Sequence, residues 1–375
     1  MRPSQQLSAR IFLSICAIFV ASRTLLLVSL KVAVAYLSPK SHLQGVAGLL
    51  CHWDCIWYLS VADIGYTQKE IVQGAFAQTN FCFSPLLPVV MRLLGYLFHG
   101  NILYVGLAFT NACFLAALVY VYRYARLLNF DHRVALLSVA LICLLPQSIA
   151  FSALLSEGPF LLLLAMAIYH ARRGDYLVSG IAAALLSATR SNGVLFIVFA
   201  LVMVIRQGGF RGLLAPWRTP ERFVPLVFAP LGMFVFWAYC FAVTGDAFAQ
   251  VSAEEHGWNW HFYPVWENVA AMLRVDGQPR YAAIAALSTL ACSFVLLREG
   301  LYEEFAFCCA TIALILSGSG VVSIFRYWIV LFPIWVVVAR MLSPRPVPLV
   351  VAIISTVVLA GVFLCALALR SPLSL

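Results

Sequence analysis

Four charged residues lie in or beside long apolar segments of this chain and are the first candidates for chemistry. They are Asp54, Glu157, Arg190 and Arg326. A charge at the centre of a bilayer costs about 2.5–3.5 kcal/mol on insertion scales, so such residues usually have a partner or a function. A carboxylate among aromatic side chains can accept a proton, and two guanidinium groups can bind an anion, with phosphate as the natural candidate.

The sequence around these charges suits a sugar phosphate. Aromatic residues flank Asp54, Asn192 adds a neutral donor at a predicted helix start, and the polar, aromatic segment 250–261 suits carbohydrate. We predict Asp54 as the catalytic base and expect the following residues to bind substrate: His52, Trp53, Tyr58, Glu157, Arg190, Asn192, Arg326 and Tyr327. Arg23, inside the first apolar segment, is a lesser third arginine for the phosphate.

Structural roles are the alternatives for the same residues. Asp54 could cap a short helix over 54–64, and the arginines could extend their charged ends to the membrane surface. The aromatic residues could lie in the interfacial belt. The segment 80–88, which has two prolines three positions apart, is better explained as a rigid loop than as a catalytic one.

Cysteine and histidine patterns give no metal site. Most of the eleven cysteines lie in apolar segments and are expected to be packing residues, and the histidines are widely dispersed. A disulfide among Cys51, Cys55 and Cys82 is left open. We expect no metal and no cofactor.

Composition decides the class of protein. Of 375 residues, 63% are hydrophobic and 10% are charged, against roughly 25% charged in a soluble domain. This excludes a soluble enzyme, a disordered chain and a nucleic-acid-binding domain. We predict an all-α polytopic membrane protein with a single domain over 1–375.

About eleven apolar segments are expected to cross the membrane, and 11–37 is expected to be a retained helix rather than a cleaved signal. They are 11–37, 103–122, 134–152, 158–171, 177–189, 193–205, 223–244, 281–298, 304–322, 326–342 and 347–369. Residues 177–205 could instead form one long helix. With the N-terminus in the cytoplasm, most arginines lie inside and two large loops, about 38–102 and 245–280, lie outside.

An ordered set of short motifs resembles a known family. The set is His52-Trp53-Asp54, Tyr58, Gly65-Tyr66, Phe83-Ser84-Pro85-Leu86, Pro88, Ser156-Glu157, Phe160, Arg190-Ser191-Asn192-Gly193, Arg326-Tyr327 and Phe332-Pro333. Together the motifs span roughly 20–335. They resemble the second mannosyltransferase of glycosylphosphatidylinositol synthesis (the PIG-V family) and its bacterial relatives.

The resemblance implies a C-type glycosyltransferase bundle whose active site faces away from the cytoplasm. It also implies a polyprenyl-phosphate-linked sugar donor, typically mannose, and a catalytic carboxylate in the first outer loop, which corresponds to Asp54. The acceptor, whether lipid, glycan or protein, stays open. The small size and the preference for arginine over lysine fit a bacterial inner membrane with a site on the periplasmic or exterior side.

We therefore hypothesise an inverting transfer of the sugar in one displacement. A transporter or flippase of a lipid-phosphate-linked substrate is the main alternative, because it would use the same buried arginines. A non-catalytic partner of another membrane enzyme is a second alternative. A transporter needs access from both faces of the membrane, whereas a transferase needs a closed cytoplasmic side.

Overall fold

The computed structural model describes residues 8–37, 46–52, 54–68, 71–73, 76–319 and 324–368, and helices dominate it. The N-terminal half contains α1 (Ala9–Leu37), α2 (Val46–Leu49), α3 (Cys55–Ile64), β1 (Ile71–Gln73), β2 (Phe76–Gln78), η1 (Asn80–Cys82), α4 (Leu86–Leu97), α5 (Ile102–Leu127), α6 (His132–Leu144), η2 (Ser148–Phe151), α7 (Glu157–Arg173) and α8 (Tyr176–Thr189). The strands β1 and β2 pair in antiparallel register, with Ile71 opposite Gln78.

The second half is also helical. It contains η3 (Ser191–Leu195), α9 (Phe196–Leu213), η4 (Pro216–Arg218), η5 (Pro220–Phe223), α10 (Val224–Phe228), α11 (Leu231–Thr244), α12 (Ala249–Trp258), α13 (Val265–Arg274), α14 (Gln278–Ser293), α15 (Val295–Arg298), α16 (Tyr302–Ser317), α17 (Ile324–Tyr327), α18 (Phe332–Leu342) and α19 (Pro346–Ala368).

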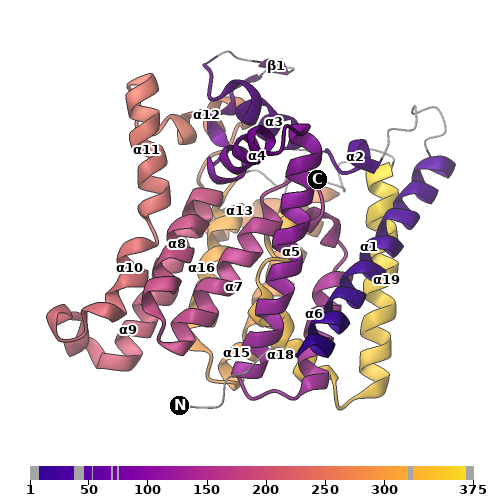
Figure 1. The fold of residues 1–375 in the computed structure, drawn as a ribbon, viewed down its shortest axis with the longest axis vertical. Helices are drawn as coiled ribbons and strands as arrows, with labels where there is room; N and C mark the ends of the chain where they lie inside the picture. The colour runs from indigo at the N-terminus through magenta and orange to yellow at the C-terminus, as the bar shows by residue number, and fades with distance from the viewer. Residues whose placement is uncertain are drawn as a thin grey trace.

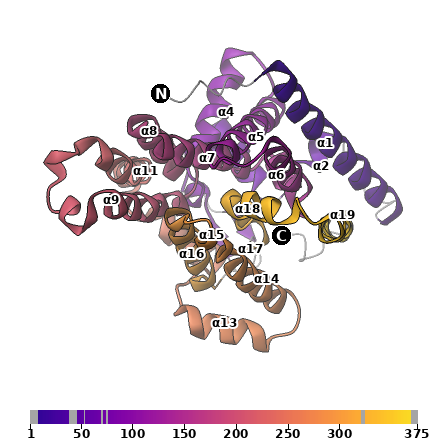
Figure 2. The ribbon, with the colours of Figure 1, turned by 90° about the horizontal axis from the view of Figure 1, so that it is seen from below.

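The long helices run side by side, and the elements of the predicted outer loops gather at one end. In Figure 1, α3, α4, α12 and β1 lie at the top, which we call the loop end, and α15 lies at the bottom, which we call the closed end. Figure 2 shows α5, α6, α7 and α18 near the centre, with α1 and α19 on one side and α13 on another. This arrangement brings the two predicted outer loops to one face of the bundle.

Five helices in the described ranges are long and apolar enough to cross a membrane. They are Ala9–Leu37, Ile102–Leu127, Ser191–Leu213, Gln278–Arg298 and Pro346–Ala366. A sixth span is possible if Pro220–Phe228 and Leu231–Thr244, which meet at a bend of 43°, count as one. The predicted helical membrane fold is thus confirmed, with the short strands β1 and β2 as an addition, while the predicted number of eleven spans is not confirmed. Several of the remaining segments form shorter apolar helices.

Breaks in the helices explain why several predicted spans are longer than the helices observed. The predicted span 134–152 is interrupted, because α6 ends at Leu144. Pro146 follows two residues later and cannot donate a helix hydrogen bond, so the helix does not continue. Arg23 of α1 donates from Nη2 to the carbonyl of Cys143 (2.6 Å) and from Nη1 to that of Ser148 (2.7 Å). The guanidinium thus satisfies carbonyl groups that the break leaves without helical partners.

A second break lies between α8 and α9, so residues 177–205 form two helices rather than one. The chain leaves α8 at Arg190, whose backbone is extended, and forms the short helix η3 before α9 begins. Gly193 makes this turn possible, because a Cβ atom at this position would lie 2.4 Å from the carbonyl oxygen of Leu186. The break places the Arg190 side chain at the loop end.

Close packing of α5 against α7 fixes the start of α7. A Cβ atom on Gly158 would lie 2.8 Å from the carbonyl oxygen of Thr110 on α5. The absence of a side chain at Gly158 therefore lets the two helices approach. This contact sets the depth of the neighbouring residue, Glu157, in the core.

Candidate active site

The structure brings the four charged candidates together at the loop end. Arg326 Nη2 donates to Asp54 Oδ2 at 2.9 Å, although the two residues are 272 positions apart. Arg326 Nη1 lies 3.5 Å from Glu157 Oε1, and Arg190 Nη1 lies 2.5 Å from the same oxygen. Two carboxylates and two guanidinium groups thus alternate in one charge-balanced cluster, which we call the charged quartet.

Asp54 does not cap the helix that follows it. It occupies the position before α3, and its carbonyl accepts hydrogen bonds from the amides of Trp57 and Tyr58. Its side chain makes no capping hydrogen bond and instead meets Arg326. The capping alternative is therefore wrong, and the carboxylate is directed to the charged quartet.

A disulfide closes the loop that carries Asp54. Cys51 and Cys55 are bonded, with Cα atoms 5.2 Å apart, whereas Cys82 is free. Cys55 directly follows Asp54 and is fully buried. The covalent bridge ties both ends of the short segment 51–55, so the backbone at Asp54 is held against the bundle.

Glu157 contacts both arginines from the buried side of the charged quartet. It is fully buried at the start of α7, and its Oε1 contacts both guanidinium groups. The Arg190 guanidinium also lies over the ring of Tyr327, 4.3 Å from its centroid. None of these charges extends to the surface of the bundle, because the Arg190 and Arg326 side chains are 13% and 3% exposed. The surface-seeking alternative for the arginines is therefore wrong.

A cavity of about 420 Å³ borders the charged quartet. Six of the candidates from the sequence line it, namely Asp54, Tyr58, Arg190, Asn192, Arg326 and Tyr327. Further lining comes from the loop-end elements and from α16, namely Cys82, Phe83, Ser84, Gln250, Glu254, Trp258, Trp260, Phe262, Leu314 and Ile315. The walls thus combine charged, amide and aromatic groups, as in sites that bind small polar ligands.

Two groups in the cavity keep unused hydrogen-bonding capacity. Arg190 uses Nη1 for Glu157, and its Nε and Nη2 atoms bond to no other side chain in the ranges the structure covers. Asn192 Oδ1 is buried, and likewise no partner for it is found among the described residues. Buried polar atoms usually have partners, so these atoms point to a ligand. A phosphate matches Arg190, and a hydroxyl or amide hydrogen matches Asn192 Oδ1.

Tyr58 contributes a neutral hydroxyl to the cavity. It is buried, and burial raises the pKa of its phenol further above its usual range, while the charge of Arg190 acts in the opposite direction. The hydroxyl interacts with Ser156, the residue before Glu157. Tyr58 therefore remains protonated at neutral pH and is suited to hydrogen bonding rather than to proton abstraction.

Four predicted residues are not among the described residues that line the cavity. His52 is half-buried but does not line it, and its carbonyl accepts the amide of Cys55. Trp53 lies outside the described residues. Arg23 binds the break after α6, so it belongs to the bundle core and not to the phosphate site. Glu157 lies behind the cavity wall, where it positions Arg190 and Arg326.

Sequence reasoning missed Glu254 and its neighbours on α12. Gln250, Glu254 and Trp258 recur every four residues, which places them on one face of a helix, and all three line the cavity. That spacing was the available signal in a segment interpreted only as suited to carbohydrate. Within the described ranges, no three His, Cys, Asp or Glu side chains group as metal ligands would.

Sequence comparisons relate the chain to a known family. The family model described as mannosyltransferase (PIG-V) matches residues 9–255. The GPI alpha-1,6-mannosyltransferase 2 of Mus musculus is 28% identical over 215 residues, which is 52% of this chain and 41% of that protein. The Homo sapiens protein of the same name is 28% identical over 224 residues, covering 54% and 43%. The match thus spans less than half the length of these relatives.

A solved structure shares the fold. The oligosaccharyltransferase of Archaeoglobus fulgidus, in its apo form, superposes on 95% of this chain and 56% of its own with a TM-score of 0.50 and 12% identity. At this identity the likeness concerns the fold alone. The family match covers well over half of the chain and includes the Asp54, Glu157 and Arg190 segments. The chain therefore belongs to the mannosyltransferase (PIG-V) family.

Proposed function

We propose that the chain is a membrane glycosyltransferase that moves a sugar, mannose in the first instance, from a polyprenyl-phosphate donor to a hydroxyl group of an acceptor. The observation that carries the proposal is the charged quartet, in which Asp54 and two arginines border one cavity. Family membership supports the sugar and the reaction class. The donor class is inferred from the arginines and from the apolar helices that can hold a lipid tail.

The proposed reaction is a single displacement. The acceptor oxygen attacks the anomeric carbon, the bond from that carbon to the phosphate oxygen breaks, and the phosphate leaves with the electron pair. Asp54 accepts the proton of the attacking hydroxyl. Because the attack and the departure take place on opposite faces of the carbon, the anomeric configuration inverts.

The arginines stabilise the charge that grows on the leaving phosphate. Arg190 has free donors in the cavity, and Arg326 lies beside it. In the structure Arg326 is paired with Asp54. A bound phosphate competes with Asp54 for Arg326, so arrival of the donor frees the carboxylate to accept a proton. Glu157 keeps both arginines in place during this exchange.

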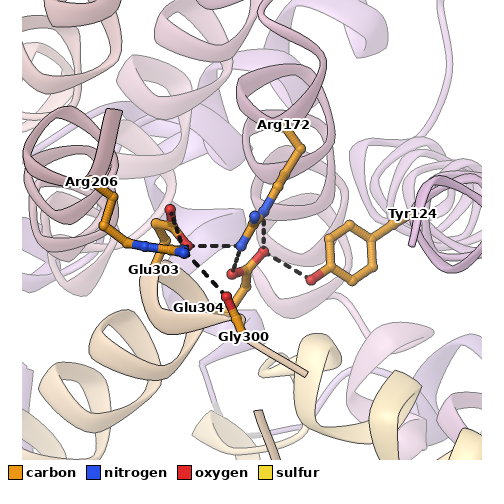
Figure 3. Close-up of polar contacts among 6 residues, drawn as sticks. All are labelled: Tyr124, Arg172, Arg206, Gly300, Glu303 and Glu304. Carbon is orange, nitrogen blue, oxygen red and sulfur yellow. Dashed lines mark hydrogen bonds and ion pairs between the residues drawn. The ribbon is translucent and has the colours of Figure 1, made fainter. Parts of the chain in front are cut away.

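An ion-pair cluster at the closed end supports a transferase over a transporter. Arg172 and Arg206 bind Glu303 and Glu304, and the hydroxyl of Tyr124 donates to Glu304 at 2.9 Å (Figure 3). The cluster joins α5, α7, α9 and α16. Glu157 and Arg172 occupy opposite ends of α7, so the two clusters are separated by about 22 Å of helix. A route between these four helices would require the ion pairs to break.

The disulfide supports a loop end that faces away from the cytoplasm. Disulfides persist in oxidising compartments and are rare in the cytosol. The Cys51–Cys55 bridge lies beside Asp54 at the loop end. The proposed location is therefore an integral membrane protein whose cavity opens to the periplasm or the exterior.

The central test is transfer of labelled sugar. The purified protein, in lipid with radiolabelled polyprenyl-phosphate mannose and a membrane extract, is expected to label an acceptor. Asp54→Asn removes the proton acceptor but keeps the size of the side chain, so the rate should fall by about 100-fold or more. Asp63→Asn is the matched control, because Asp63 lies on the same helix but is exposed. A fully active Asp54→Asn variant would remove Asp54 from the role of base.

A further inference from the structure

The α12 face of the cavity contains a carboxylate that the proposed mechanism does not use. Glu254 lies on α12, in the second large loop, and lines the same cavity as Asp54. Within the part of the chain that the structure describes, no hydrogen bond or ion pair to its carboxylate is found. A carboxylate in a cavity without such a partner is costly unless a ligand satisfies it.

The residues one turn before and one turn after Glu254 are anchored. Gln250 is buried, and its Nε2 donates to the carbonyl of Cys82 (3.3 Å) and to Ser84 Oγ (3.4 Å). Trp258 packs edge-on against Trp57 and Phe83, with ring centroids 5.5 and 5.7 Å apart. Both anchors lie on the same face of α12 as Glu254. The helix therefore holds Glu254 in the cavity wall rather than leaving it to move with a loop.

A further bond fixes the C-terminal end of α12. Gln78 of β2 donates from Nε2 to the carbonyl of Gly257 at 3.0 Å. Beyond the helix, Trp260 packs on Gly318, where a Cβ atom would lie 2.5 Å from the indole nitrogen. The wall thus presents a rigid carboxylate next to the aromatic surfaces of Trp258 and Trp260, a combination that suits a ring bearing hydroxyl groups.

Burial and a nearby charge affect the protonation of Glu254. Burial raises the pKa of its carboxyl group to about 7, and the positive charge of Arg190 acts in the opposite direction. Near neutral pH both protonation states are populated. The carboxylate accepts a hydrogen bond from a hydroxyl group, and the carboxylic acid donates one. Either form is able to bind an alcohol.

We propose that Glu254 binds a hydroxyl group of the acceptor headgroup and orients it towards the reacting centre beside Asp54. The inference rests on the proposed transferase function and names the residue that recognises the second substrate. The donor phosphate occupies the arginine side of the cavity, and the acceptor occupies the α12 side. The acceptor is then a ring with several hydroxyl groups rather than a simple alcohol.

The experiment measures transfer from polyprenyl-phosphate mannose to two probes, octyl glucoside and octanol, in nanodiscs. Octyl glucoside should be the better acceptor. Glu254→Ala should raise the KM for octyl glucoside by about tenfold, because a hydrogen bond to a charged group is lost, and should leave the KM for the donor unchanged. Glu254→Gln, which keeps hydrogen-bonding capacity, should cause a smaller rise in the same KM. Glu255→Ala is the control, because Glu255 is the exposed neighbour outside the cavity.

The outcomes separate the inference from the proposed function. If the wild-type protein transfers sugar and Glu254→Ala keeps the wild-type acceptor KM, the inference is wrong while the transferase function stands. A rise in the donor KM instead would place Glu254 on the phosphate side and would also overturn the inference. If the wild-type protein transfers sugar to neither the probes nor a membrane extract, the proposed function itself fails. Glu254→Gln gives the answer if Glu254→Ala does not fold.

Discussion

The two carboxylates of the charged quartet have different surroundings. Glu157 is fully buried and holds Arg190 and Arg326, whereas Asp54 lies at the cavity edge and is 28% exposed. A buried carboxylate without space for substrate is suited to positioning. A partly exposed carboxylate beside the cavity is suited to reaction. The geometry therefore supports the different roles that we propose for the two carboxylates, although the sequence presents both as isolated acidic residues near apolar segments.

Replacement of Arg190 should weaken binding of the donor and slow the departure of its phosphate. Arg190→Gln removes the free guanidinium donors from the cavity while Arg326 still contacts Glu157. The KM for polyprenyl-phosphate mannose should rise by about tenfold or more, because charge-assisted hydrogen bonds to phosphate are lost. The acceptor KM should change little. Initial rates at varied donor concentration check the result.

Arg274→Gln is the matched control for this variant. Arg274 ends α13 and is exposed away from the cavity lining. Both variants should elute from size exclusion as the wild-type protein does. An unchanged donor KM in Arg190→Gln would exclude Arg190 from phosphate binding.

The residue types in the sequence indicated the site, but the sequence could not show which carboxylate pairs with which arginine. Asp54 and Arg326 are 272 positions apart, and two carboxylates and two arginines allow several pairings. The family resemblance indicated the role of Asp54. Its ion pair with Arg326 depends on the tertiary fold, which places α17 near the start of α3. Glu254 was missed because one acidic residue among polar and aromatic neighbours is not distinctive. Only its spacing from Gln250 and Trp258 on a helix was informative.

Short elements at the loop end shape the site, and the disulfide is the strongest constraint among them. The bridge joins the chain after α2 to the first residue of α3. Without it, the segment that carries Asp54 would depend on its backbone hydrogen bonds and on the ion pair with Arg326. Constraints of this kind lower the cost of holding a reacting group in place.

Removal of the disulfide should lower kcat clearly and should have only a small effect on thermal stability. Cys51→Ser should reduce kcat by about tenfold, because a displacement of about 1 Å at a reacting group has effects of this size or larger. The variant should also be insensitive to thiol reductants, whereas the wild-type enzyme should lose activity to the same level when it is reduced. Kinetic assays with and without reductant, beside a thermal unfolding curve, measure both effects.

Cys292→Ser serves as the control, because Cys292 is free and exposed on α14. It should match the wild-type enzyme in both conditions. Full activity of the reduced wild-type protein would show that the bridge does not position Asp54.

Apolar segments predicted the helices well and their ends poorly. Local composition indicates where an apolar helix lies, but a crossing also needs sufficient length. Pro146 shortens α6, and the turn through Gly193 separates α8 from α9. Such breaks depend on tertiary contacts, including that of Arg23 with the end of α6. For this reason the number of spans could not be fixed from hydropathy.

At the scale of the whole molecule, the two ends of the bundle have opposite characters. The loop end contains a cavity, unused polar atoms and a charged quartet that a ligand can rearrange. The closed end contains ion pairs among Arg172, Arg206, Glu303 and Glu304 that satisfy one another. A cavity at one end and an ion-pair cluster at the other fit the proposed transferase, whose substrates arrive from a single side.

The closed end should determine stability rather than catalysis. Glu304 is fully buried and pairs with Arg172, so Glu304→Gln leaves an arginine without full compensation. The free energy of unfolding should fall by about 3 kcal/mol, the usual cost of breaking a buried pair from one side. Thermal unfolding in detergent measures the loss.

Glu267→Gln is the comparison for this change, because Glu267 is exposed on α13. At a temperature where both variants are folded, their donor KM values should equal that of the wild-type enzyme. A large rise in donor KM for Glu304→Gln would connect the closed end to the active site.

The contact between α1 and α19 has a consequence for biogenesis. These helices lie together on one flank of the bundle, where Leu30 and Ala33 belong to the same apolar cluster as Phe363 and Leu364 (Figures 1 and 2). During translation α1 leaves the ribosome long before α19 does. Until α19 is made, this flank of α1 lacks its helical partner, and we expect the acyl chains of the bilayer to cover it while the protein is synthesised.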